Sequence, residues 1–201
     1  MPGARAPEEQ RRRQILDAAV VVAGRERLDG LTVRKVAAEA NLSPGSVFFH
    51  FGSKEALLLG LLDRVLVEIV GRRPPEDAAG AGTATARDTL LGYARQELER
   101  LPDEREFVEL FFDFWVMGTR HPAVREVMVD ALSAYRASFL PLAERIVAEE
   151  ATRFRGVSAE HITHVIAGFV HGTGFQAVID PGGADVDDVL RALEALVPAP
   201  A

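Results

Sequence analysis

Apolar residues recur at helical spacing through most of this chain, and no stretch alternates apolar and polar residues as a strand would. The first stripe contains Ile15, Ala19 and Val22, which share one face of a helix. Helices are expected over residues 8–24, 33–40, 44–50, 53–72, 86–101, 103–119, 122–154, 158–179 and 185–197. The predicted fold class is therefore all-α, with about nine helices.

Capping residues set the limits of the second and third helices. Thr32 and Ser43 carry hydroxyls that can accept from the free N–H groups of a following helical turn. Pro44 suits the first position of a helix, where its missing N–H costs nothing. Asn41 tolerates the left-handed conformation that ends the preceding helix. Residues 32–50 are thus predicted to form two short helices joined by a tight turn.

Prolines and small residues divide the rest of the chain. Pro74 and Pro75 should end the fourth helix, and residues 76–85 have the composition of a flexible loop. Pro141 falls inside the expected helix 122–154 and should kink it or mark a short break. Residues 1–7 are expected to form a disordered arm.

Charge is unevenly distributed along the 201 residues, whose net charge is −7. Residues 1–54 carry nine Lys and Arg against six Asp and Glu, and the remainder of the chain is acidic. A basic end suits a polyanionic partner. The absence of cysteine excludes disulfides and thiolate metal sites. No apolar run resembles a signal peptide or a membrane span, so a cytoplasmic protein without a membrane partner is expected.

Residues 32–58 carry the pattern with the clearest chemistry. Val36, Val47 and Phe51 are expected to face inward. The second helix then presents small, polar and aromatic side chains on its outer face. A helix-turn-helix of this kind can place its second helix in the major groove of DNA.

Residues 11–58 resemble the N-terminal domain of TetR-family transcriptional regulators. The matching features are the leading helix RRRQILDAAVVVAG, the Gly30-Leu31-Thr32-Val33 segment, Ser43-x-Gly45, and the closing His50-Phe51-x-Ser53-Lys54-x-x-Leu57. Residues 105–197 are similar, more weakly, to the C-terminal domains of betaine-repressor-type members. The resemblance implies a DNA-binding domain over residues 1–53 and a ligand-binding and dimerisation domain over residues 54–201.

The resemblance also implies which residues contact DNA. These are Thr32, Arg34, Ser43, Pro44, Gly45, Ser46, Phe48, Phe49, His50 and Lys54. Thr32 and Lys54 would bind phosphates, and Gly45 would permit close backbone approach. The family usually carries Tyr at the position of Phe48, so the contact of that hydroxyl is lost or replaced by ring packing on a sugar or a thymine methyl.

Aromatic side chains concentrate in residues 107–115 and on the neighbouring helices. A helix that is apolar nearly all round can simply be buried, and this reading stays open for most of them. The resemblance implies a cavity for an apolar or amphipathic small molecule. Its expected lining is Tyr93, Phe111, Phe114, Trp115, Met117, Phe139, His171 and Phe175.

Small residues in the helix 158–179 would allow another helix to approach closely. They predict a homodimer interface containing His164, Gly168, Gly172, Val189 and Leu193, although the last helix could instead cover its own core. The spacing of His161, His164 and His171 shows no converging carboxylate or further histidine, so no metal is expected there. These histidines are expected at the surface or interface, with a ligand contact by His171 as the alternative.

Enzyme signatures are absent from the sequence. No nucleophile elbow, phosphate loop or metal-ligand motif occurs, and Glu109 and Asp113 are expected to be solvated. The leading hypothesis is a homodimeric, ligand-responsive transcriptional regulator without a cofactor, a repressor that a small molecule releases from a pseudo-palindromic operator. The alternative is a helical ligand-binding protein or enzyme whose N-terminal hairpin no longer reads DNA.

Overall fold

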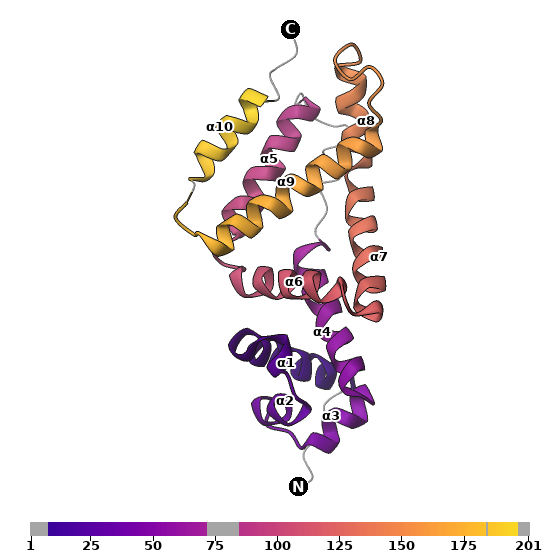
Figure 1. Cartoon of the computed structure of the whole chain (residues 1–201), viewed down its shortest axis with the longest axis vertical. Coiled ribbons are helices and arrows are strands. Elements are labelled where there is room, and N and C mark those ends of the chain that lie inside the picture. Colours follow the sequence, from indigo (N-terminus) through magenta and orange to yellow (C-terminus); the bar gives the residue numbers. More distant parts are fainter. Residues whose placement is uncertain (1–7, 72–84, 184, 197–201) are drawn as a thin grey trace. The chain divides into compact units, whose positions relative to one another are not determined.

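The computed structural model describes residues 8–71, 85–183 and 185–196, and these residues are helical apart from short turns (Figure 1). Their ten helices are α1 (Glu8–Gly30), α2 (Val33–Glu39), α3 (Pro44–Phe51), α4 (Lys54–Ile69), α5 (Ala86–Arg100), α6 (Arg105–Gly118), α7 (Pro122–Ser138), α8 (Leu140–Glu149), α9 (Ala159–Ile179) and α10 (Val186–Leu196). The all-α prediction is confirmed. The predicted arm at residues 1–7, the stop at Pro74 and Pro75, and nearly all of the predicted loop lie outside the described residues.

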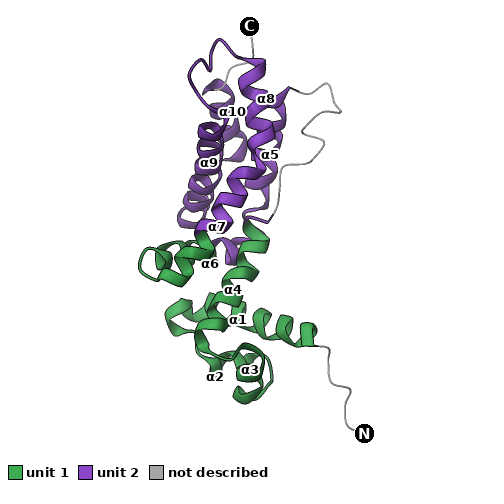
Figure 2. Cartoon of the chain, turned by 90° about the vertical axis from the view of Figure 1, so that its right-hand side faces the viewer, with its two compact units in different colours: residues 1–69, 109–128 green, residues 70–108, 129–201 purple. Residues whose placement is uncertain are grey.

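The chain divides into two compact units (Figure 2). Unit 1 combines residues 1–69 with 109–128, and unit 2 combines residues 70–108 with 129–201. Helices α6 and α7 each supply residues to both units. The predicted division at residue 53 separates the expected DNA-binding and ligand-binding functions, and the two compact units do not test it.

The core of unit 1 forms where α1 packs against α2 and α4. The predicted stripe of α1 is buried, with Ile15 and Ala19 fully enclosed and Val22 nearly so. The helix runs past its expected end near residue 24, and its regular geometry is interrupted at Arg27, where φ is 62° and ψ is 171°. Arg27 therefore redirects the backbone, and the buried Leu28 and Leu31 follow.

The caps of α2 and α3 form as predicted. The Thr32 hydroxyl accepts from the Lys35 backbone N–H at 3.3 Å, and the Ser43 hydroxyl accepts from the Ser46 N–H at 3.1 Å. Asn41, with φ of 55°, adopts the left-handed conformation between the two helices. Each cap satisfies an N–H that helix geometry leaves unpaired, so the turn between α2 and α3 is locally determined.

Unit 2 has an aromatic core at the crossing of α5, α7 and α9. Tyr93, Tyr135 and Phe139 are buried together, and the two phenol oxygens are 3.2 Å apart in a hydrogen bond. Burial raises the pKa of Tyr93 to about 12 and also raises that of Tyr135, so both phenols stay neutral.

The helix predicted over residues 122–154 is divided into α7 and α8. Phe139 lies between them and Pro141 occupies the first turn of α8, where its missing N–H costs little. The predicted break at this proline is therefore confirmed. On the other side of α5, the buried Leu190 of α10 packs with Ala94 and Leu98.

Candidate nucleic-acid interface and ligand cavities

The helix-turn-helix holds α3 by one apolar face and leaves the other face open. Val47 and Phe51 are buried, whereas Phe48 is exposed and Phe49 is 83% exposed. Exposing a phenyl ring to water is unfavourable, and a protein normally buries such rings in its core. The outer face of α3 is thus available to a partner.

Most of the ten predicted DNA-contact residues are exposed. Ser46 and His50 are half-buried, and the other eight, Thr32, Arg34, Ser43, Pro44, Gly45, Phe48, Phe49 and Lys54, are exposed. A Cβ added at Gly45 would meet only the Ser43 hydroxyl oxygen, at an ordinary 3.8 Å. Intramolecular packing therefore does not require glycine at this position.

Side chains of α1 fix the recognition helix in place. The Arg12 guanidinium donates to the His50 carbonyl and lies 4.3 Å from the centre of the Phe51 ring. The Gln14 amide donates to the Ala40 carbonyl at 2.8 Å, at the end of α2. These contacts orient both short helices on α1 without using any of the predicted DNA-contact side chains.

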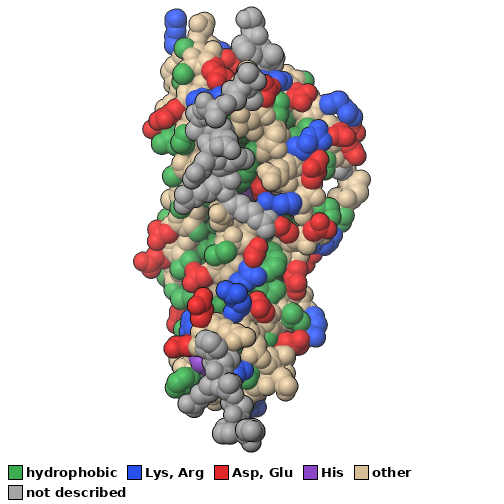
Figure 3. Space-filling model, turned by 180° about the vertical axis from the view of Figure 1, so that it is seen from behind, with side chains coloured by type: hydrophobic (Ala, Val, Ile, Leu, Met, Phe, Trp, Pro, Cys, Tyr) green, Lys and Arg blue, Asp and Glu red, His purple; other side chains and the backbone are tan. Residues whose placement is uncertain are grey.

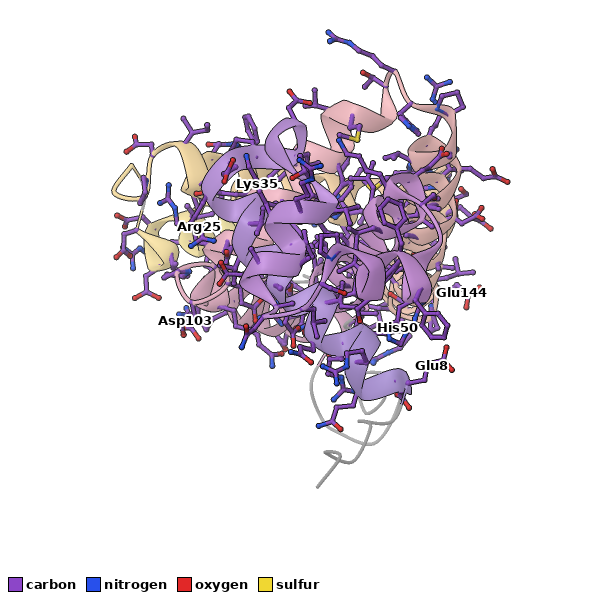
Figure 4. All side chains as sticks on the ribbon, turned by 90° about the horizontal axis from the view of Figure 1, so that it is seen from below. Glu8, Arg25, Lys35, His50, Asp103 and Glu144 are labelled. Atoms are coloured by element: carbon purple, nitrogen blue, oxygen red, sulfur yellow. The ribbon has the colours of Figure 1, made fainter. Side chains whose placement is uncertain are left out.

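Several charged side chains of unit 1 form ion pairs with one another. Lys35 pairs with Glu26, and Arg25 pairs with Glu39. Figure 4 shows Lys35 and Arg25 on one side of the view and His50 on the other. Within the described residues, no ion pair involves Lys54. On the face displayed in Figure 3, acidic and basic side chains are interspersed rather than segregated.

Unit 1 contains a hollow of about 810 Å³, here called the charged hollow. Its lining comes from the end of α1, the start of α4 and the end of α6, and consists of Arg27, Leu28, Asp29, Lys54, Glu55, Leu58, Asp113, Val116, Met117, Arg120 and His121. The Arg27 guanidinium donates to Asp113 at 2.9 Å and to Glu109 at 3.3 Å. Burial raises the pKa of Asp113, and Arg27 opposes this rise. Glu109 and Asp113, expected to be solvated, are thus half-buried and ion-paired with Arg27.

Unit 2 contains a second hollow, of about 630 Å³, here called the apolar hollow. It lies between the end of α5, the start of α6, the end of α9 and the start of α10. Its lining consists of Leu98, Leu101, Pro102, Arg105, Thr173, Phe175, Gln176, Ala177, Val178, Ile179, Asp180, Pro181, Gly183, Val186 and Val189. Aliphatic side chains dominate its walls, and Arg105 is its one cationic lining residue.

The eight predicted ligand-lining residues are divided between the two units. Phe111, Phe114, Trp115 and Met117 belong to unit 1, whereas Tyr93, Phe139, His171 and Phe175 belong to unit 2. Met117 lines the charged hollow and Phe175 the apolar hollow, while Phe111, Phe114 and Phe139 fill the core. Sequence reasoning missed Arg105 and Val186, because nothing in the local pattern shows that these distant residues share a cavity.

The three histidines of α9 differ in environment. His161 and His164 are exposed, whereas the ring of His171 stacks on Tyr135 with centroids 5.2 Å apart. Burial, helped by the nearby Arg136 charge, lowers the pKa of His171 to about 4. Among the described residues, no group of three or more His, Asp or Glu is arranged to hold a metal ion.

One face of α9 is apolar and open within the subunit. Val165 and Ile179 are each 69% exposed, and a Cβ added at Gly168 or Gly172 would meet no atom within 4 Å. By length and composition α9 is long and apolar enough to cross a membrane, and 22% of its most apolar window is buried in the subunit. By contrast, Val189 and Leu193, also predicted at the interface, are partly buried against the subunit's own α5 core.

Comparison with known proteins places this geometry in a family. Residues 15–61 match the family of bacterial regulatory proteins named tetR, and residues 86–199 match the C-terminal domain of BetI-type transcriptional repressors. The BetI regulator of Rhizobium meliloti is 28% identical over 133 residues, which are 66% of this chain and 64% of that protein.

Two solved structures share the fold. A regulator from Pseudomonas aeruginosa superimposes with a TM-score of 0.81 and 20% identity, covering 96% of this chain and 91% of that one. A regulator from Saccharomonospora viridis, solved with choline, has a TM-score of 0.72 and 22% identity and covers 94% of this chain and 96% of its own. Because the BetI-type match alone spans more than half of the chain and the helix-turn-helix matches separately, the protein belongs to the TetR family of transcriptional regulators.

Proposed function

We propose that this chain is a cytoplasmic, effector-responsive repressor that binds a pseudo-palindromic operator as a homodimer. The observation that carries the proposal is the outer face of α3, where Phe48 and Phe49 stand in solvent on a helix capped by Ser43 and anchored by Val47 and Phe51. A rigid helix with an exposed, chemically varied face is suited to the major groove.

Phosphate contacts and base contacts would divide between the ends and the middle of this surface. Thr32 and Lys54, near the N-termini of α2 and α4, would fix the protein on the backbone. Ser46 and Phe49 would meet base edges or thymine methyls. Phe48 lacks the hydroxyl that the family usually carries, so its ring would pack on a sugar or a methyl group.

The homodimer would form through the open face of α9. Val165, Gly168 and Gly172 recur at three- and four-residue spacing, and the glycines would let a second α9 approach closely. A two-fold axis through this seam would present two α3 helices to half-sites about one helical turn of DNA apart, on the order of 34 Å.

An effector bound in unit 2 would favour a conformer in which the two DNA-binding domains of the dimer no longer match the half-site spacing. The related Saccharomonospora viridis regulator was solved with choline, which supports small-molecule binding by this fold. Which effector this chain binds depends on the residues that line its own cavity.

Fluorescence anisotropy on the chain's own upstream DNA, measured against salt concentration, tests the proposal. Specific binding should weaken steeply with salt, and Lys54→Ala should reduce the slope by about one counterion per subunit. Asp63→Ala, at an exposed position of α4 outside the predicted DNA surface, is the control. No preference for the upstream DNA over random duplex would favour the alternative, a helical ligand-binding protein or enzyme that does not read DNA.

A further inference from the structure

The aliphatic lining of the apolar hollow comes from α5 and α10, two helices that pack against each other. Leu98 and Leu101 come from the end of α5 and the residue that follows it, and Val186 and Val189 come from α10. At about 630 Å³ the hollow falls within the range of small-molecule sites, roughly 300–1,000 Å³. Its walls can therefore bury an apolar group that forms no hydrogen bonds.

The polar groups of the hollow are few and come mainly from α9 and the first residue of α6. The Arg105 guanidinium donates to the Val178 carbonyl at 2.9 Å, which holds this cation against the end of α9. The Thr173 hydroxyl donates back to the carbonyls of its own helix, at 2.8 and 3.0 Å. Among the described lining residues, the side chains with N–H groups are Arg105, whose guanidinium carries five, and Gln176.

The charges of the hollow argue against a cationic ligand. Aromatic rings and carboxylates recognise quaternary ammonium groups, but Phe175 is the one aromatic residue of the lining. The Asp180 carboxylate, the one acidic group, lies beside Gly183, where an added Cβ would come within 2.3 Å of it. This carboxylate therefore covers its own turn, whereas Arg105 can form charge-assisted hydrogen bonds with an anion.

We propose that the apolar hollow is the effector site and that it takes an amphipathic molecule with an aliphatic body and one carboxylate. The body packs on Leu101 and Val186, and the carboxylate binds Arg105. This inference rests on the proposed function, because it names the class of effector of that regulator. Decanoate is the probe, because it pairs a flexible aliphatic chain with one carboxylate.

Isothermal titration of the full chain with decanoate, decan-1-ol and choline tests the site without DNA. Wild-type protein should bind decanoate more tightly than decan-1-ol and should not bind choline. Arg105→Gln should weaken decanoate binding about tenfold, the effect expected for a charge-assisted contact, and leave decan-1-ol unchanged. Arg191→Gln removes an exposed arginine of α10 outside the lining and is the matched control.

A second variant tests the volume of the hollow. Val186→Trp should fill it and abolish binding of both decanoate and decan-1-ol, while Val129→Trp, at an exposed position of α7, should bind as the wild type does. Decanoate binding that survives both Arg105→Gln and Val186→Trp would overturn the proposal, as would no binding by the wild type or preferential binding of choline. Operator anisotropy of the ligand-free protein is measured in parallel, so a failure of DNA binding is distinguished from a failure of this site.

Discussion

The two units each contain a hollow of several hundred cubic ångströms, but their linings are chemically opposite. The charged hollow of unit 1 is lined by arginine, lysine, histidine and carboxylates, several of them paired across helices. The apolar hollow of unit 2 is lined mainly by aliphatic side chains with a single cation. Ion pairs constrain the positions of helices, whereas aliphatic walls accept an apolar guest. This contrast supports the proposal that unit 1 contacts DNA and that unit 2 binds the ligand and the partner subunit.

Gly172→Arg should have the largest effect and should act through unit 2 alone. An arginine there would place an unpaired charge in the proposed seam, at a cost of several kcal/mol, enough to dissociate a dimer of ordinary affinity. Sedimentation should give the mass of one subunit, with helical content retained, because a Cβ at Gly172 meets no atom of its own subunit. Gly92→Arg, an equally open glycine of α5, should stay dimeric. A dimeric Gly172→Arg protein would place the seam elsewhere.

His171 should make the stability of unit 2 depend on pH. The unfolded chain binds this proton below about pH 6.5, and the folded subunit binds it only below about 4. Between these values the unfolded state holds more protons, so stability rises with pH. Acidification across this window should cost about 3 kcal/mol.

Urea unfolding between pH 4 and pH 7.5 measures this dependence. His171→Gln should flatten it, and His164→Gln, at an exposed position on the same helix, should preserve it. An unaltered slope in the His171 variant would mean that other groups cause the loss of stability in acid.

Phe49→Ala tests whether unit 1 reads bases. A contact with a base edge or thymine methyl contributes roughly 1–3 kcal/mol of discrimination, so the preferred site selected from a random DNA pool should change. Ser46→Ala should shift the same base positions by a smaller amount. Arg25→Ala, outside the predicted surface, is the control. Identical preferred sites for all four proteins would remove α3 from base recognition.

Two substitutions of Arg27 test whether its backbone conformation is strained, separately from the ion pairs that its side chain forms. Its φ of 62° and ψ of 171° lie in a region that essentially only glycine adopts freely. Arg27→Gln loses the pairs with Glu109 and Asp113 and keeps the strain, whereas Arg27→Gly loses both. The free energy of unfolding of Arg27→Gly should therefore exceed that of Arg27→Gln by about 1 kcal/mol, which urea unfolding measures. Equal stability of the two variants would show that this backbone conformation costs nothing.

The helix-turn-helix could be predicted closely because its determinants are local. The Thr32 and Ser43 hydroxyls, Pro44 and the left-handed Asn41 act within a few residues of their own positions, and the structure has each of them as expected. The end of α1 could not be predicted so well. The unusual backbone at Arg27 accompanies ion pairs with residues more than 80 positions away, and no local pattern signals it.

The sequence by itself determined the helical class, the caps, the break at Pro141 and the exposed face of α3, since periodicity and capping depend on neighbouring residues. The tertiary structure alone decided which aromatic residues fill cores and which side chains share a hollow. Phe111 and Met117 are six residues apart on one helix, yet the first is buried in the core and the second lines the charged hollow. A cavity is the space left by elements distant in the chain, and its lining therefore depends on how the helices pack.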